Sequence, residues 1–179
     1  MRNCLAKPAF IILLLFVWNN VVFAQENCDL FSKNATLLLD LKVGMSPQEA
    51  QNIFGRDLKI KVKKRGERTI FQNYIKNPAP NSLNGVRAIF LRFYDQKLYQ
   101  LEIFYEPRTD LKTVEEISGV LASQLSFSAA KWQIKNKRAE ISCGDLSLVA
   151  DNVLNPRIEV TDNAILAKIE EKRNKKSEK

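Results

Sequence analysis

The sequence predicts an α+β protein: an antiparallel sheet with helices packed on one face, organised as two αβ units in tandem, each a helix followed by strands. Helix signals followed by strand signals occur twice, first over residues 46–105 and again over residues 111–160. Many strand segments alternate apolar and polar residues, the pattern of a strand with one buried face. Short turns separate most of them, which favours antiparallel hairpins.

The first 24 residues have the layout of an export signal. Arg2 and Lys7 precede an apolar run over residues 9–18, and residues 22–24 match a small-residue cleavage site. A membrane-spanning helix needs about 20 apolar residues, and this run ends well before that length. We therefore expect a signal peptide over residues 1–24 that is removed, and export to the periplasm or the extracellular space.

The rest of the chain is long enough for one hydrophobic core and too short for two domains of ordinary size. We expect a single α+β domain over residues 25–170. Residues 171–179 are mostly charged and are expected to form a flexible tail. The formal net charge of the whole chain is +8, so a negatively charged partner is one class to consider.

Cysteine and histidine usage restricts the chemistry. Cys4 would leave with the signal peptide, so Cys28 and Cys143 would remain in a compartment that favours oxidation, and we predict that they pair. The alternative is two unrelated thiols. The chain contains no histidine, which excludes Ser-His-Asp and Cys-His catalysis and the usual zinc sites with histidine ligands. We therefore expect no catalytic residue, no metal site and no cofactor.

The first predicted helix begins with a clear start signal. Ser46 can act as the N-cap, Pro47 suits the first helical position, and Glu49 completes a capping box. Gly55 can end the helix in the left-handed conformation. Strands are predicted over residues 58–63, where lysines alternate with apolar residues, and over residues 69–74, with a turn between them and a surface loop over residues 77–85.

The clearest predicted hairpin joins residues 86–94 to residues 98–105. A three-residue loop over residues 95–97 would pair Leu91 with Leu101 and Phe93 with Tyr99, whereas a two-residue turn would set apolar residues opposite polar ones. We therefore expect the three-residue loop, with Lys97 at a positive φ angle.

The second unit repeats the order of the first. A capping box at Thr113 and Glu116 predicts a helix whose apolar residues share one face. Residues 132–150 predict a three-strand meander with two-residue turns at residues 136–137 and 144–145, and residues 157–160 predict a last strand. Asp162 can cap a terminal helix.

One run carries a family resemblance. Residues 43–50, which read Val-Gly-Met-Ser-Pro-Gln-Glu-Ala, with Phe54 and Gly55 after them, resemble a helix of the β-lactamase-inhibitor-like and SmpA/OmlA-type envelope superfamily, and residues 93–99 look like the central hairpin of exported bacterial proteins of that shape. The resemblance implies helices layered against a curved antiparallel sheet that binds proteins. The chain departs from the pattern in lacking a lipidation cysteine and in having Gln96 and Lys97 where a glycine is common.

Two surfaces are candidate binding sites. One is the outward side of the central hairpin, where aromatic and apolar residues surround an arginine, a composition that protein-recognition patches favour: Phe90, Arg92, Tyr94, Leu98 and Phe104. The alternative is that a helix covers this side. The other is a basic hairpin that could meet an anionic surface, or whose lysines merely protect a sheet edge: Lys59, Lys61, Lys63, Lys64, Arg65 and Arg68.

The resulting expectation is a non-enzymatic extracytoplasmic binding or interaction module that contacts a protein partner through a sheet face. Two alternatives stay open: a polyanion-binding or envelope-surface-binding protein that uses the basic hairpin and tail, and a hydrolase with a site free of histidine. We do not expect nucleic acid as the partner, nor a membrane span once the signal peptide is removed.

Overall fold

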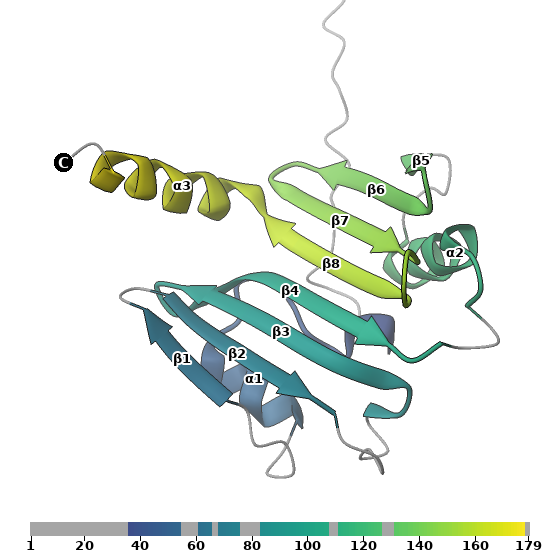
Figure 1. Cartoon of the computed structure of the whole chain (residues 1–179), viewed down its shortest axis with the longest axis horizontal. Coiled ribbons are helices and arrows are strands. Elements are labelled where there is room, and N and C mark those ends of the chain that lie inside the picture. The colour runs from purple at the N-terminus through teal and green to yellow at the C-terminus, as the bar shows by residue number, and fades with distance from the viewer. Residues whose placement is uncertain are drawn as a thin grey trace, which may run out of the picture.

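The described strands form one antiparallel sheet in a computed structural model that describes residues 36–54, 61–65, 68–75, 83–107, 111–126 and 131–177. Its strand order is β1-β2-β3-β4-β8-β7-β6-β5, and every neighbouring pair is antiparallel (Figure 1). The strands are β1 (Lys61–Arg65), β2 (Arg68–Tyr74), β3 (Val86–Tyr94), β4 (Lys97–Tyr105), β5 (Gln133–Lys135), β6 (Arg138–Cys143), β7 (Leu146–Asp151) and β8 (Arg157–Asp162).

The sheet is built from two units of the same order. The short 3-10 helix η1 (Thr36–Leu38) and helix α1 (Pro47–Phe54) precede β1 to β4, and helix α2 (Val114–Leu125) precedes β5 to β8. The last strand of each unit, β4 and β8, pair with each other at the centre of the sheet. The predicted α+β fold with two αβ units and an antiparallel sheet is confirmed. Helix α3 (Asn163–Ser177) follows β8 and extends away from the sheet.

Both unit helices begin with the predicted capping boxes. The Ser46 amide donates to Glu49 Oε2 at 2.7 Å, and the Glu49 amide donates to Ser46 Oγ at 3.2 Å. In α2 the Thr113 amide donates to Glu116 Oε2 at 3.0 Å, and the Glu116 amide donates to Thr113 Oγ1 at 3.2 Å. These bonds satisfy backbone groups that a helix start otherwise leaves without partners.

The capping box of α1 gives a pH-dependent contribution to stability. The backbone and side-chain hydrogen bonds of Ser46 lower the pKa of Glu49 below its ordinary value of 4.5. The stabilisation that the ionised Glu49 carboxylate gives to the folded state is therefore fully present above pH 4.5. It is lost as the pH falls through the pKa of Glu49 in the folded protein. We expect the difference in free energy of unfolding between wild type and Glu49→Gln to be constant near neutral pH and to shrink below about pH 4.5. Urea titrations across this pH range measure it, and a difference that grows toward acid pH would contradict it.

The hydrophobic core lies between one face of the sheet and helices α1 and α2. The Leu37 amide donates to Gln124 Oε1 at 3.0 Å, and the Tyr105 hydroxyl donates to the Leu37 carbonyl, so η1 is tied to α2 and to β4. Helix α2 buries its apolar residues Val114, Ile117, Leu121, Ala122 and Leu125. The largest fully buried side chains of the core include Phe93, Leu101, Ile103, Ile117, Leu121, Leu148, Ile158 and Val160.

The predicted loop of the central hairpin is wrong, although the pairing further along its strands is correct. Leu91 pairs with Leu101 as expected, but Phe93 pairs with Leu98, and the register shifts between Arg92 and Phe93. The turn has two residues, Asp95 and Gln96, both at positive φ (47° and 61°). Tyr99 is an extra residue in β4, and this β-bulge restores the apolar register that a two-residue turn alone would break. Lys97 therefore has no positive φ angle.

Other boundaries differ in smaller ways. Strand β1 (Lys61–Arg65) continues two residues beyond the predicted end at residue 63, and its predicted start at residues 58–60 lies outside the described residues. Ile134 is 46 % exposed because β5 is an edge strand. The meander turns agree with the prediction, since Ile134 pairs with Ala139 and Cys143 with Leu146.

The terminal helix is longer than the sequence indicated. Asp162 caps it as predicted, because the Ile165 amide donates to Asp162 Oδ1 at 2.9 Å. The flexible tail was expected to start at residue 171, but α3 continues through Ser177. An ion pair between Glu171 and Lys175 at 2.5 Å and basic residues in the last turn both favour this continuation.

Candidate binding face of the sheet

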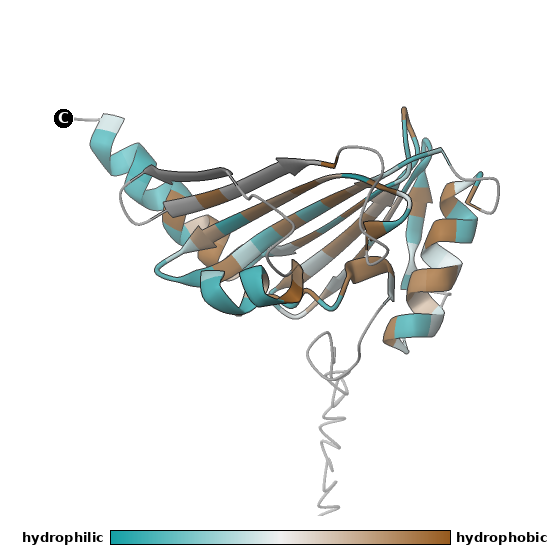
Figure 2. Cartoon of the chain, turned by 90° about the horizontal axis from the view of Figure 1, so that it is seen from below, coloured by the Kyte–Doolittle hydropathy of each residue, from teal (hydrophilic) through white to brown (hydrophobic). Residues whose placement is uncertain are grey.

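We call the side of the sheet opposite the core the outer face. Figure 2 shows α1 and α2 on the core side and, among the described elements, only α3 at one end of the other side. Phe90, Tyr94 and Phe104 are half-buried on this outer face. The rings of Phe90 and Phe104 meet edge to face, with centroids 5.6 Å apart and planes at 73°. The outer face of the central hairpin thus keeps aromatic surface within reach of a partner.

One member of the predicted aromatic patch lies elsewhere. Leu98 is fully buried in the core cluster, so its assignment to the outward side is wrong. The physical reason is the β-bulge at Tyr99, since one extra residue reverses the side to which the strand positions before it point. Arg92, Phe90, Tyr94 and Phe104 remain together on the outer face.

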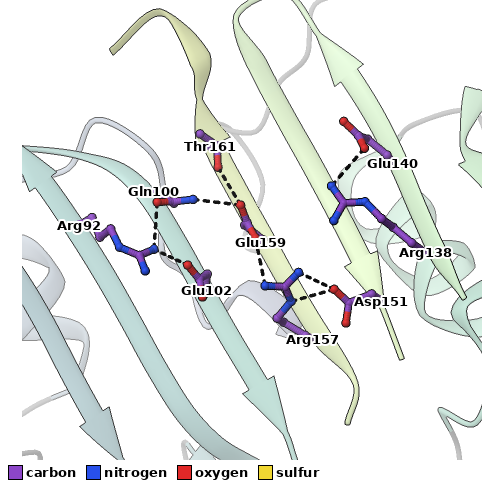
Figure 3. A network of polar contacts seen from close by, with 9 residues as sticks. All are labelled: Arg92, Gln100, Glu102, Arg138, Glu140, Asp151, Arg157, Glu159 and Thr161. Atoms are coloured by element: carbon purple, nitrogen blue, oxygen red, sulfur yellow. Dashed lines mark hydrogen bonds and ion pairs between the residues drawn. The ribbon is translucent and has the colours of Figure 1, made fainter. Parts of the chain in front are cut away.

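A continuous polar network crosses the outer face from β3 to β8 (Figure 3). Arg92 forms an ion pair with Glu102 and donates to Gln100 Oε1 at 2.9 Å. Gln100 Nε2 donates to Glu159 Oε1 at 2.9 Å across the β4–β8 pair, and Thr161 Oγ1 donates to the same oxygen at 3.3 Å. Every connection joins neighbouring strands or positions two residues apart, so the sheet holds these side chains in place.

Arg157 extends the network from β8 to β7. Its Nη2 atom lies 2.5 Å from Asp151 Oδ2, and its Nη1 atom lies 3.3 Å from Glu159 Oε2. Burial acts to lower the pKa of Arg157, but the hydrogen bond and charge of Asp151, with the charges of Glu159 and Glu102, raise it above its ordinary value. Its guanidinium carbon also lies 5.8 Å from the centroid of the Phe104 ring. Arg157 is therefore a fixed cation.

Two carboxylates face each other at the centre of this network. Glu102 in β4 lies directly opposite Glu159 in β8, an arrangement that is destabilising unless cations neutralise it. Arg92 pairs with Glu102 and Arg157 pairs with Glu159. Sequence reasoning found Arg92 but missed Asp151, Arg157 and Glu159. The alternation of Arg157, Glu159 and Thr161 along one strand was the available signal.

A hollow of about 530 Å³ lies beside this network on the second unit. Its volume is in the range of small-molecule pockets. It is lined by Val153 and by the polar or charged residues Gln133, Lys135, Asn136, Arg138, Glu140, Asp151 and Arg157. Arg138 and Glu140 are paired at 3.2 Å and about half exposed.

The structure describes the remaining predicted sites only in part. Lys61, Lys63, Lys64, Arg65 and Arg68 lie in the first two strands and are described by backbone alone, whereas Lys59, Cys28 and the predicted signal peptide lie outside the described residues. Cys143 is half-buried at the end of β6 and is disulfide-bonded. Since Cys28 is not described, the pairing of Cys28 with Cys143 stays a prediction.

Within the described ranges, no three histidine, cysteine, aspartate or glutamate residues lie close enough to hold a metal ion. None of the helices seen in these ranges is long and apolar enough to cross a membrane. No protein-family model matches the chain, and neither the curated proteins nor the solved structures contain a match to it.

Proposed function

We propose that this protein is a non-enzymatic binding module, exported from the cytoplasm, that contacts a protein partner through the outer face of its sheet. The observation that carries the proposal is the combination of half-exposed Phe90, Tyr94 and Phe104 with the ordered network around Arg92 and Arg157. Aromatic residues and arginine are the residue types that contribute most to protein interfaces.

The fixed positions of the polar side chains on the outer face support the same proposal. A side chain that is already held in its bound position loses little conformational entropy on association. Gln100, Glu102 and Glu159 have fixed partners, and they lie on adjacent central strands. The resemblance of residues 43–55 to exported protein-binding proteins implies the same class of function. The apolar run over residues 9–18 supports export.

Site-specific photocrosslinking tests the proposal. A photoreactive residue at position 104 should give a discrete protein adduct in the producing cells, because Phe104 lies at the middle of the proposed contact surface. The matched control is position 123 on α2, where Ser123 is exposed on the other side of the molecule. No adduct at position 104, or the same adducts at both positions, would contradict the proposal.

Binding measurements with the purified partner then give the size of the effect. Phe104→Ala should raise the Kd about tenfold or more, the usual effect of removing an aromatic anchor near the centre of an interface. Ser123→Ala should leave the Kd unchanged within about twofold, because a residue outside an interface contributes little. Titration calorimetry checks both values. An unchanged Kd for Phe104→Ala, with the fold intact by circular dichroism, would show that the partner binds elsewhere.

A further inference from the structure

Two basic segments that are far apart in the sequence lie at the same end of the molecule. Strands β1 and β2 carry five basic residues and no acidic one, and α3 carries five basic and two acidic residues. All the other described residues together carry ten basic and twelve acidic residues. The positive charge of the described part of the chain is therefore concentrated in these three elements, which we call the basic end.

Pairing and a ring contact bring these elements together. Arg68 at the start of β2 pairs with Tyr94 at the end of β3. The ammonium of Lys172 in α3 lies 5.2 Å from the centroid of the Tyr94 ring. Figure 1 shows α3, the end of β1 and the start of β2 at the same end of the molecule. Charges within about 8–10 Å of one another at physiological salt add their potentials, and the Lys172–Tyr94 contact places α3 against β3, the strand that pairs with β2.

The cations of α3 are presented to solvent. Lys168, Arg173 and Lys176 are exposed and have no ion-pair partner among the residues that the structure describes. From Glu170 to Ser177 every residue of the helix is exposed. This half of α3 has no buried apolar stripe, so it is suited to lie on a charged surface and not to insert into an apolar one.

We propose that the basic end adsorbs the protein to an anionic phospholipid bilayer. The exposed cations of α3, with the five basic residues that the sequence places in β1 and β2, suit an extended anionic plane such as a membrane surface. The hollow found on the described surface lies on the second unit, at the other end of the sheet. Four of the five basic residues of α3 are lysines, which act as point charges without the fork geometry used to recognise bases.

Co-sedimentation with vesicles tests the proposal on the protein purified in the form that cells accumulate. The probes are vesicles of phosphatidylcholine alone and vesicles in which about one lipid in four is phosphatidylglycerol. We expect binding to the second kind only, and loss of that binding when the salt concentration rises from about 50 mM to about 500 mM, since screening weakens exposed charges. Equal binding to both kinds, or binding that resists salt, would overturn electrostatic adsorption.

Matched triple variants locate the surface. Lys168→Gln, Arg173→Gln and Lys176→Gln together should weaken vesicle binding about a hundredfold, the expected effect of three cations near an anionic bilayer. The same loss of charge in the second unit should change binding less than about threefold, because Lys112, Lys135 and Lys137 precede α2 or flank the β5–β6 turn, at the other edge of the sheet from β1 and β2. This control combines Lys112→Gln, Lys135→Gln and Lys137→Asn, all exposed positions. Equal losses in the two variants would overturn the assignment to the basic end.

Two further measurements separate this proposal from its alternatives. Tighter binding to a single-stranded oligothymidylate than to the anionic vesicles at the same salt would overturn the membrane as the ligand. Phe104→Ala should leave vesicle binding unchanged because Phe104 pairs with Arg157 at the start of β8, the end of that strand away from α3. A loss of vesicle binding in Phe104→Ala would overturn the assignment to the basic end, and failure of either proposal leaves the other intact.

Discussion

Leu98→Ala lowers the free energy of unfolding by about 2–5 kcal/mol, because the truncation leaves a cavity among buried side chains. Leu98 is fully buried, and its partner in the β3–β4 pair, Phe93, is fully buried as well. The backbone of Leu98 also forms hydrogen bonds with the residues that precede α1. Its amide donates to the Met45 carbonyl at 2.9 Å, and its carbonyl accepts from the Gly44 amide at 2.7 Å. Urea denaturation measures the loss.

The neighbouring residue provides the control for this prediction. Lys97 is exposed at the end of the hairpin turn, so Lys97→Ala should change the free energy of unfolding by less than about 0.5 kcal/mol. If Leu98 lay on the outer face, as the sequence alone indicated, the two substitutions would have similarly small effects. Equal stability of Leu98→Ala and Lys97→Ala would therefore show that the bulged register is wrong.

The helix starts could be predicted because their signals are local. Ser46 with Glu49, and Thr113 with Glu116, contain within four residues both partners of the hydrogen bonds that they form. The same holds for the two-residue turn of the meander, where Asn136 and Lys137 both adopt positive φ. A feature whose partners lie within one turn can be inferred without knowledge of the fold.

The hairpin turn could not be predicted in the same way. Asp95 and Gln96 adopt positive φ without a glycine, and the turn keeps the apolar register because Tyr99 forms a bulge further along the strand. No local preference of Tyr99 indicates a bulge. The bulge is instead favoured because it lets Leu98 and Leu101 both be buried in the core. This burial depends on the packed structure and not on local sequence.

Only the part of the outer face that belongs to one hairpin could be predicted from the sequence. Arg92 and Glu102 belong to one hairpin, so sequence could place them together. Arg157 and Glu159 join them only because β8 pairs with β4 at the centre of the sheet. This long-range pairing follows from how the two units combine, and the sequence contains no local signal for it.

Arg157→Met should destabilise the protein by about 2–4 kcal/mol. The substitution leaves Asp151 without its cation and leaves Glu102 opposite Glu159 with only Arg92 to neutralise them. Removing one partner of a buried ion pair costs about 3–5 kcal/mol. The arginine side chain is 23 % exposed and the Asp151 side chain 12 % exposed, so the expected loss is reduced for partial screening by solvent. Chemical denaturation at neutral pH measures it.

Arg138→Met is the matched control, since it removes the same charge from the same face of the sheet. Arg138 and its partner Glu140 are 47 % and 45 % exposed, and exposed pairs contribute about 0–1 kcal/mol. Adding Glu159→Gln to Arg157→Met should recover part of the loss, because it removes one of the two opposed carboxylates. If Arg157→Met and Arg138→Met were equally stable, or if Glu159→Gln gave no recovery, Arg157 would not be the cation that neutralises Asp151 and the opposed carboxylates of Glu102 and Glu159.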